Sequence, residues 1–325
     1  MTIDMRALAA LAALALAPLA ALGQAQYPAK PIRIVVPYTA GGPADLLVRG
    51  LGQRLTDLWG QQVVVENRPG ANEIIAAEAV ARSPGDGYTF LLASDAVFTL
   101  NQHLYSKIPY DPAKDFVPVG RLVTANLMLV ARPKFPAASV AELIDYARKN
   151  PGKVTYGSVG AGGVNHLAMA WFATQNGLKM EHVPYKGLVQ ALQDVGEERV
   201  DVMFAVIGGA APLLAAGKLK ALAQSGRARN ALIPNVPTFA EAGYPNADAS
   251  FYFGLAAPAG TPREIVAKIG AESARIVNTP EFREKFLQNL GFVPVGETPE
   301  QFAAFLTTDR ELGEKRVKAS GAKLD

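Results

Sequence analysis

The regular alternation of short apolar runs with amphipathic segments is the feature that most restricts how this chain can fold. From Pro31 onward, short β-branched and apolar runs are each followed by a segment whose apolar residues recur at helical spacing. The first part of the chain predicts strands at residues 32–36, 63–66 and 89–93 and helices at residues 46–58 and 73–81. Such alternation is typical of parallel sheets that carry helices on both faces. The chain is therefore predicted to be an α/β protein.

The same alternation restarts in the second part of the chain. Strands are predicted at residues 127–131, 154–157, 180–183, 200–204 and 219–223, and helices at residues 140–149, 164–177, 190–197 and 210–216. One further strand is predicted at residues 251–257, after which the pattern becomes purely helical. A second αβ unit inserted in the first predicts two lobes joined by two crossover strands, which we place at residues 122–130 and 251–257. A cleft between two lobes is a common place for a small ligand.

Two glycine-rich turns stand where a predicted strand leads directly into a predicted helix. The first reads PYTAGGPAD over residues 37–45, and the second reads GSVGAGGVNH over residues 157–166. The free N–H groups and the dipole of a helix N-terminus favour an anion, and glycine allows a ligand to approach the backbone closely. Two such turns that face each other would clamp a small carboxylate. Each turn taken alone is equally well explained by loop geometry, because glycine is a common turn residue.

Composition excludes several classes of site. The 325 residues carry a formal net charge of +3 and include no cysteine. No disulfide, thiol nucleophile, thiolate metal site or lipoprotein anchor is therefore available. The three histidines, His103, His166 and His182, do not have the spacing of a zinc site, and no basic run with interleaved aromatic residues suggests nucleic acid. We expect no metal, no cofactor and no nucleic-acid partner.

The N-terminus has the pattern of a secretory signal. Residues 7–22 are almost entirely alanine and leucine, and residues 23–25 place small side chains at the two positions that signal peptidase reads. We predict cleavage after Ala25 and export of the remaining chain. An N-terminal membrane anchor is the alternative, which we disfavour because a span needs ~20 apolar residues and because Asp4 offsets the charge of Arg6.

The sequence contains two enzyme motifs in incomplete form. Ser158 sits in a turn that resembles the nucleophile elbow of hydrolases, but Tyr156 replaces the first glycine of Gly-x-Ser-x-Gly. That arrangement also needs an acid and then a histidine, whereas the first aspartate after the serine is Asp194 and no histidine follows it. Residues 160–165 lack the last glycine of a dinucleotide fingerprint, and neither turn has the lysine of a phosphate-binding loop. We expect a binding protein rather than an enzyme, with a secreted hydrolase that uses Ser158 and His166 as the minor alternative.

Several short motifs occur in order along almost the whole chain after its N-terminal segment. They are VPY…GG…D at residues 36–45, VENRPGA at 65–71, DGYT at 86–89, YDP…DF at 110–116, HVPYKG at 182–187, AAGKL at 215–219 and PAGTP at 258–262. Together they resemble the Bug family, the periplasmic solute receptors of tripartite tricarboxylate transporters. The resemblance implies a two-lobed Venus-flytrap periplasmic binding protein of type II-like form, in which each lobe is a mixed, mostly parallel sheet flanked by helices. It also implies capture of a small carboxylate without enzymatic activity.

The resemblance further implies which residues hold the ligand. The two glycine turns match the loops that bind the ligand's carboxylate from either lobe, and Ser94 and Tyr185 match other loops at the cleft. The residues expected to bind the ligand are Tyr38, Thr39, Ala40, Gly41, Gly42, Asp45, Asn72, Ser94, Ser158, Gly160, Gly163, His166, Tyr185, Phe204 and Ala205. Simpler roles remain open for three of them: Asp45 can stabilise its helix start, His166 can be a structural side chain, and Tyr185 can belong to an ordinary turn.

Two departures from the family's usual pattern bear on the ligand. Asn72 and Glu73 replace a glycine pair in the loop after VENRPGA, which puts a polar side chain and an extra carboxylate near the expected site. Whether Glu73 faces the cleft is left open by the sequence. Ala205 follows the strand at residues 201–204, where members that take amino acids carry an aspartate that pairs with the ligand's ammonium group. Its loss removes a charged hydrogen bond worth ~1.5–3 kcal/mol and favours a ligand without an amino group.

The expected site is also less acidic and more apolar than is usual in the family. The helix after the second turn is apolar at residues 170–171, where a glutamate is common. Aromatic side chains that could line the site are Tyr38, Phe98, Phe204 and Tyr252. We therefore expect an amino-free acid, either aromatic or dicarboxylic.

These inferences combine into one hypothesis. Residues 1–25 are a signal peptide, residues 26–125 and 252–325 form one lobe, and residues 126–251 form the other. The protein would be a monomeric receptor of the periplasm that closes on its ligand and delivers it to the membrane subunits of a tripartite tricarboxylate transporter. A receptor that presents its ligand to a signalling protein is the alternative, which the sequence does not separate from transport.

Overall fold

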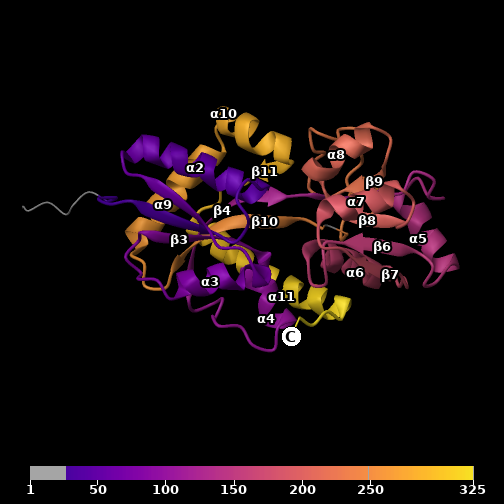
Figure 1. Cartoon of the computed structure of the whole chain (residues 1–325), viewed down its shortest axis with the longest axis horizontal. Coiled ribbons are helices and arrows are strands. Elements are labelled where there is room, and N and C mark those ends of the chain that lie inside the picture. Colours follow the sequence, from indigo (N-terminus) through magenta and orange to yellow (C-terminus); the bar gives the residue numbers. More distant parts are fainter. Residues whose placement is uncertain (1–26, 248, 325) are drawn as a thin grey trace, which may run out of the picture.

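Two sheets with helices on both faces make up the protein. The computed structural model describes residues 27–247 and 249–324, so the predicted signal peptide, residues 1–25, lies outside the described residues. Figure 1 shows the two sheets side by side in two lobes.

The first sheet has six strands in the order β11-β4-β10-β3-β1-β2. These strands are β1 (Ile32–Val36), β2 (Val63–Asn67), β3 (Thr89–Ser94), β4 (Phe116–Ala125), β10 (Phe251–Pro258) and β11 (Phe292–Pro294). β1 is parallel to β2 and β3, whereas β10 is antiparallel to β3 and β4, and β11 is antiparallel to β4. The helices of this lobe are α2 (Pro43–Trp59), α3 (Ile74–Ala81), α4 (Asn101–Leu104), α9 (Arg263–Val277), α10 (Pro280–Phe282) and α11 (Pro299–Ser320), with single helical turns at Ala71–Glu73, Ala96–Leu100, Arg283–Leu287 and Gln288–Leu290.

The second sheet has five strands in the order β7-β6-β8-β5-β9. These strands are β5 (Leu127–Ala131), β6 (Thr155–Ser158), β7 (Glu181–Pro184), β8 (Val202–Val206) and β9 (Lys220–Gln224). β6 is parallel to β7 and β8, whereas β5 is antiparallel to β8 and β9. The helices of this lobe are α5 (Val140–Lys149), α6 (Val164–Gln175), α7 (Leu188–Gly196) and α8 (Ile207–Ala215).

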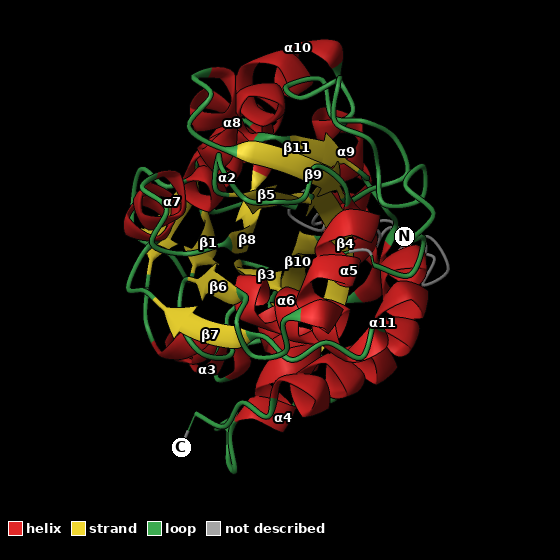
Figure 2. Cartoon of the chain, turned by 90° about the vertical axis from the view of Figure 1, so that its right-hand side faces the viewer, coloured by secondary structure: helices red, strands yellow, loops and turns green. Residues whose placement is uncertain are grey.

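Each sheet separates two apolar cores. Along β1, Ile34 packs on one face with Leu47 of α2, while Val35 packs on the other face with Val80 of α3. This follows from the two-residue period of a strand, and it favours apolar side chains at consecutive positions where both faces are covered, as at residues 34–36. Figure 2 shows the result from the second lobe, with α2, α8, α9 and α10 on one side of the strands and α3, α4, α6 and α11 on the other.

The chain passes between the lobes where the strands of each sheet end, and we call this side of each sheet the crossing edge. β4 ends at Ala125 and β5 begins at Leu127, while β10 begins at Phe251 opposite Ala125. Because Ser94 of β3 pairs near the start of β10, and β1 is parallel to β3, the carboxyl ends of β1 and β3 lie at this crossing edge. In the second sheet Val206 lies opposite Leu127, so the carboxyl ends of β8 and its parallel neighbour β6 face the first sheet.

The lobes also touch away from the crossovers. α11 extends beside α6, where Leu167 and Val317 join Leu104 in a small apolar cluster (Figure 1). On the other face of the molecule, the side chain of Asn230 donates to the carbonyl oxygen of Gly291 at 3.2 Å. The two edges are therefore held close together in this structure.

The predicted α/β class with two mixed sheets and two crossovers is confirmed. The prediction of a purely helical tail is wrong, because β11 pairs with β4 at the edge of the first sheet. β11 has only three residues and ends in proline, which suits an edge strand and leaves too few residues to show a pattern. β4 also begins at Phe116, well before the crossover expected from residue 122.

Candidate functional site

The first glycine turn, residues 38–42, is held in place by the buried carboxylate of Asp45. Gly41 has a φ of +82°, which favours glycine, and its N–H donates to Asp45 Oδ2 at 2.8 Å. The same carboxylate accepts Asn67 Nδ2 and Arg49 Nε, both at 2.8 Å, and Asp45 is 1% exposed. Burial alone would raise the pKa of Asp45, but the hydrogen bonds from Arg49, Gly41 and Asn67 hold it below its usual value. Asp45 therefore shapes the turn.

The backbone of this turn remains accessible. Thr39, Ala40 and Gly41 are exposed and Gly42 is half-buried. Gly42 precedes α2 in an extended conformation, and its position supplies no side-chain cap to the helix. The first N–H groups of α2 are thus left for water or an anion, together with the positive end of the helix dipole.

Beside this turn, Glu73 directs its carboxyl group into the protein. Its Oε1 accepts the hydroxyl groups of Tyr38 and Ser94, its Oε2 accepts the Ser94 N–H at 3.1 Å, and the residue is 5% exposed. Burial raises the pKa of Glu73, and the hydrogen bonds from Ser94 and Tyr38 oppose the rise. The question left open by the sequence is answered, because Glu73 is turned inward and binds two side chains that were expected to hold the ligand.

The loop that carries Glu73 has an unusual backbone. Ala71, Asn72 and Glu73 have φ values of +46°, +48° and +73°. Such conformations cost a residue with a side chain about 1–2 kcal/mol each. Asn72 Nδ2 donates to Asn101 Oδ1 at 2.6 Å, and Asn101 Nδ2 donates to the Asn72 carbonyl oxygen at 2.8 Å. These bonds offset the strain, and they show that Asn72, expected at the ligand, supports its own loop here.

The second glycine turn, between β6 and α6, repeats this plan with a histidine as acceptor. Gly162 has a φ of +72°, and its N–H donates to His166 Nδ1 at 3.1 Å. The Ser158 hydroxyl accepts the Gly160 N–H at 3.1 Å. Gly163 precedes α6 in an extended conformation and supplies no side-chain cap. The N-terminus of α6 is therefore left open in the same way as that of α2.

Two stacked histidines support the second turn. The ring centres of His166 and His182 lie 3.9 Å apart with 5° between the planes, and Tyr156 stacks on His182 at 4.9 Å. His182 Nε2 lies 2.7 Å from Ser158 Oγ. Burial, with a contribution from His182, lowers the pKa of His166 to about 4, and burial also lowers the pKa of His182. Both imidazoles are therefore neutral at neutral pH.

This geometry corrects the minor enzymatic hypothesis. Ser158 pairs with His182 rather than with His166, and Ser158 is 0% exposed. Among the described residues no carboxylate bonds to His182, whose pKa is lowered by burial. A hydrolytic triad needs an acid behind the histidine and a serine that the substrate can reach, so this pair does not form one.

Three other residues expected at the ligand are engaged elsewhere. The Tyr185 hydroxyl donates to Asp194 Oδ2 at 2.7 Å. Phe204 and Ala205 are 0% exposed, and Phe204 packs against Phe172 in the core between the second sheet and α6. Because helices cover both faces of this sheet, the consecutive residues 202–205 of β8 are all buried. In this structure the side chains of Phe204 and Ala205 therefore lie in the cores of the second lobe.

The two glycine turns lie on facing edges of the lobes. Asp95, which follows Ser94 at the end of β3, shares a small cavity with Val164 and Leu167 at the start of α6. A Cβ atom added to Gly162 would lie 3.2 Å from Leu104 Cδ2 of the first lobe. Both helices that follow the turns thus begin at the space between the lobes, which is where α/β proteins commonly hold ligands.

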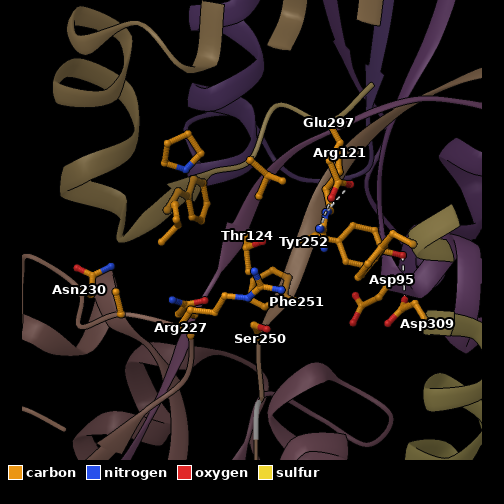
Figure 3. Close-up of a pocket in the computed structure, with 18 of the residues that line it drawn as sticks. Asp95, Arg121, Thr124, Arg227, Asn230, Ser250, Phe251, Tyr252, Glu297 and Asp309 are labelled. Atoms are coloured by element: carbon orange, nitrogen blue, oxygen red, sulfur yellow. Dashed lines mark hydrogen bonds and ion pairs between the residues drawn. The ribbon is translucent and has the colours of Figure 1, made fainter. Parts of the chain in front are cut away.

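A cavity of about 1120 Å³ lies beside the crossover strands, and Asp95 and Arg316 line both it and the small cavity at the start of α6. Figure 3 shows Thr124, Ser250 and Phe251 of the crossovers in its wall, with Arg227 and Asn230 of the segment after β9. The residues expected to bind the ligand are absent from its described lining, but Tyr252, one of the aromatic side chains expected to line the site, is part of it. The cavity also contains neither glycine turn, so we place the candidate site at the turns and not here.

Several charged groups in the wall of this cavity bind one another. Arg121 Nε donates to Glu297 Oε2 at 2.9 Å, and its guanidinium lies 3.7 Å from the centre of the Phe305 ring. Tyr252 donates to Asp309 Oδ2 at 3.1 Å, close to Asp95 (Figure 3). Burial and repulsion from Asp309 raise the pKa of Asp95 to about 7, although Arg316 opposes the rise. These pairs tie α11 to the crossover strands.

The described part of the chain has neither a metal-binding cluster nor a membrane-spanning helix. No group of three or more histidine, cysteine, aspartate or glutamate residues there is placed to hold a metal ion. Over the same residues, no helix has the length and apolar character needed to cross a membrane.

Sequence comparisons identify related receptors. The family model described as "Tripartite tricarboxylate transporter family receptor" matches residues 47–320. Protein BugT of Bordetella pertussis is 35% identical over 303 residues, which cover 92% of this chain and 91% of BugT. The UPF0065 protein in gbd 5'region of Cupriavidus necator is 37% identical over 298 residues, which cover 91% of this chain and 90% of that protein.

Solved structures show the same relationship. R. palustris Rpa4515 with adipate is 35% identical, with a TM-score of 0.79, over 92% of this chain and 100% of that chain. MatC from Rhodopseudomonas palustris with bound malate is 31% identical, with a TM-score of 0.74, over 90% of this chain and 100% of that chain.

Proposed function

Because the chain belongs to the receptor family of tripartite tricarboxylate transporters, we propose that it captures a small carboxylate between its lobes and delivers it to the membrane subunits of such a transporter. The membership confirms the resemblance seen in the motifs. The observation that carries the proposal for this chain is the pair of glycine turns on facing edges, each leading into an uncapped helix N-terminus. That arrangement suits an anion held from two sides.

Backbone groups, rather than side chains, are proposed to hold the carboxylate. Asp45, Ser158 and His166 are each bonded to their own turns, so their role is to fix the turn geometry. The exposed residues 39–41 and the first backbone N–H groups of α2 and α6, which no side chain caps, then provide the anion cradle. Tyr38 and Ser94 are proposed to lie near the ligand, with their hydroxyl groups bonded to Glu73.

The favoured ligand is an amino-free acid, aromatic or dicarboxylic. Related structures hold adipate and malate, which have no amino group. In this chain β8 ends in the apolar sequence Ala205-Val206, which offers no acid to a ligand's ammonium group. A buried ammonium group without such a partner would bind less well by ~1.5–3 kcal/mol.

Capture is proposed to follow from lobe closure. A ligand that touches both glycine turns binds the closed form better than the open form and shifts the population toward it. The closed receptor, a monomer in the periplasm after removal of the signal peptide, would then dock on its membrane partner. A receptor that presents the same ligand to a signalling protein would use the same closure, and a transport assay in a strain lacking this chain distinguishes the two.

A ligand screen tests the carboxylate clamp directly. The refolded chain from Gln26 onward is melted with adipate, malate, benzoate, phthalate and glutamate, and with adipamide as an uncharged match for adipate. We expect a saturable rise in melting temperature with one amino-free acid and none with the diamide, since a ligand at 100 times its Kd adds ~2.7 kcal/mol of stability. Equal stabilisation by adipamide, or none by any acid, would overturn the proposal.

A pair of glycine variants locates the site. Gly42 has a φ of −76°, so Gly42→Ala adds a methyl group at the start of α2 without backbone strain. We expect weaker binding of the acid identified above. Gly187→Ala makes the same change at the start of α7, where an added Cβ meets nothing within 4 Å, and serves as the control with unchanged affinity. Equal affinities for both variants would move the site away from the first turn.

A further inference from the structure

We propose that Glu73 sets the number of negative charges that the receptor accepts, and that it makes singly charged acids the favoured ligands over doubly charged acids of the same length. The inference rests on the proposed function, because it concerns the ligand of the same cleft. It narrows the choice left above between aromatic monoacids and dicarboxylic acids toward the monoacids.

The position of Glu73 places its charge at the cleft edge. Its carboxylate bonds to Tyr38, the first residue of the glycine turn, and to Ser94, the last residue of β3. Both of these residues lie at the crossing edge of the first sheet, from which α2 also begins. The acid is therefore next to the turn that is proposed to bind the ligand, although Glu73 itself comes from the loop after β2.

The hydrogen bonds of Glu73 match the ionised form. Three donors converge on its two oxygens, namely the Tyr38 hydroxyl, the Ser94 hydroxyl and the Ser94 N–H. The Ser94 hydroxyl itself accepts the Ala96 N–H at 3.1 Å, so its proton is free to point at the carboxylate. The Ser94 N–H can only donate, and both hydroxyl groups can donate to an ionised carboxyl group, so these bonds favour the ionised form and oppose the effect of burial on the pKa of Glu73. In this proposal Glu73 carries a negative charge that engages the hydroxyl donors of this edge.

Two other buried acids near Glu73 differ from it because they are attracted by arginines. Asp95 follows Ser94 and is 6% exposed, and Asp309 is 8% exposed. Arg316 and Arg121 attract Asp309, and Arg316 attracts Asp95. Neither arginine is among the groups that shift the pKa of Glu73, and within the described part of the chain its balancing contacts are the hydrogen bonds from Ser94 and Tyr38. A second carboxylate on a ligand would have to approach this buried charge, and like charges repel more strongly near a protein interior than in bulk water.

A charge-matched pair of ligands tests the proposal. Adipate and its monoamide have the same length and differ by one negative charge. Isothermal titration would compare their Kd values for the wild-type chain and for Glu73→Gln. We expect the wild type to prefer the monoamide, and Glu73→Gln to shift the ratio of Kd values toward adipate by on the order of tenfold. Glu78→Gln removes one charge from α3, where Glu78 pairs with Arg82, and should leave the ratio unchanged.

A second variant covers the case in which glutamine disturbs the loop. Because Glu73 has a φ of +73°, Glu73→Gly removes the acid and relaxes the backbone at the same time. The same shift toward adipate in both variants supports the proposal, as does binding of adipate that appears only when Glu73 is replaced. An unchanged ratio in folded variants that still bind the monoamide would overturn this inference and leave the proposed function intact. Failure of every variant to bind either acid would overturn this inference, while the proposed function would still be decided by the ligand screen.

Discussion

The two glycine turns of this molecule follow one plan. In each, a glycine with positive φ donates its N–H to a side chain four residues further along, at the first turn of the following helix. The acceptor is Asp45 in the first turn and His166 in the second, and both are buried. In each lobe, moreover, a serine at the end of a strand bonds to a titratable side chain, Ser94 to Glu73 and Ser158 to His182.

The turns differ in the charge of these acceptors. The first turn uses carboxylates, whereas the second uses imidazoles that burial keeps neutral. The comparison teaches that the geometry of such a turn requires a buried acceptor, but not a charged one. The negative charge of the acceptors in the first lobe is therefore not needed for the turn geometry. In the proposal above, the charge of Glu73 instead selects ligands by their own charge.

Removal of the acceptor in the first turn should have the largest effect. Asp45→Ala leaves the Gly41 N–H without its partner, removes one of the two acceptors of the Asn67 amide and breaks the bond to Arg49. We expect the free energy of unfolding to fall by about 3 kcal/mol, because three donors lose a buried, charged acceptor. Urea unfolding of the mature chain measures this.

The control for this change lies on the same helix. Asp57 is exposed near the end of α2 and accepts one hydrogen bond from Gln53. Asp57→Ala should change stability by less than about 0.5 kcal/mol. If Asp45→Ala were no worse than this control, the carboxylate would not be what holds the first turn.

The part of the fold that could be predicted is the part that local sequence patterns determine. The alternation of strands and helices and the positions of both glycine turns follow from periodicity and composition within short windows. Sheet order does not, because β10 enters the first sheet between β3 and β4 only through long-range pairing. β11 was missed because three residues at a sheet edge carry no periodic signal.

Prediction of the site is limited in the same way, because long-range contacts are not visible in local patterns. The turns themselves could be predicted, but the partners that fix them come from elsewhere in the chain. His182 lies 24 residues from Ser158, and Glu73 lies 35 residues from Tyr38. Asn67 supports Asp45 from β2, and its place in the VENRPGA motif was the one available signal for it. Phe204 lies in a core of the second lobe, and the sequence could not indicate this because a strand covered on both faces gives no sign of which residues reach a cleft.

The glycines of the two turns should respond unequally to the same substitution. Gly41 and Gly162 both have positive φ, so alanine costs about 1 kcal/mol of strain at either position. At Gly41 an added Cβ meets nothing within 4 Å, whereas at Gly162 it would lie 2.8 Å from Leu324 Cδ1 and 3.2 Å from Leu104 Cδ2. We expect thermal unfolding to report a loss of about 2 kcal/mol for Gly162→Ala and about 1 kcal/mol for Gly41→Ala.

The excess at Gly162 has a specific test. Leu324→Ala removes the nearer obstacle, so Gly162→Ala measured in that background should cost about as much as Gly41→Ala. An undiminished difference in that background would show that the extra cost at Gly162 does not come from Leu324.

The smallest predicted effect is a pH dependence that belongs to the second turn. The pKa of His166 is lowered from 6.5 to about 4. Between these values the unfolded chain binds more protons than the folded chain, so the contribution of His166 to stability is complete above pH 6.5 and is lost as the pH falls toward 4. Asp95 acts in the opposite sense, because its pKa is raised from 3.8 to about 7 and its contribution is lost as the pH rises through that range.

A comparison of variants separates these opposing effects. His166→Gln keeps an oxygen that can accept the Gly162 N–H but removes the titration, while Asp95 is left in place. We expect the fall in unfolding free energy between pH 6.5 and 5 to be smaller in this variant than in wild type by about 1 kcal/mol. His103→Gln provides the matched control, since His103 lies in α4 and not in the stack. The same pH dependence in both variants would mean that the stacked pair titrates in the folded chain as it does in the unfolded chain, and the contrast between an acidic and a neutral turn would lose its consequence for stability.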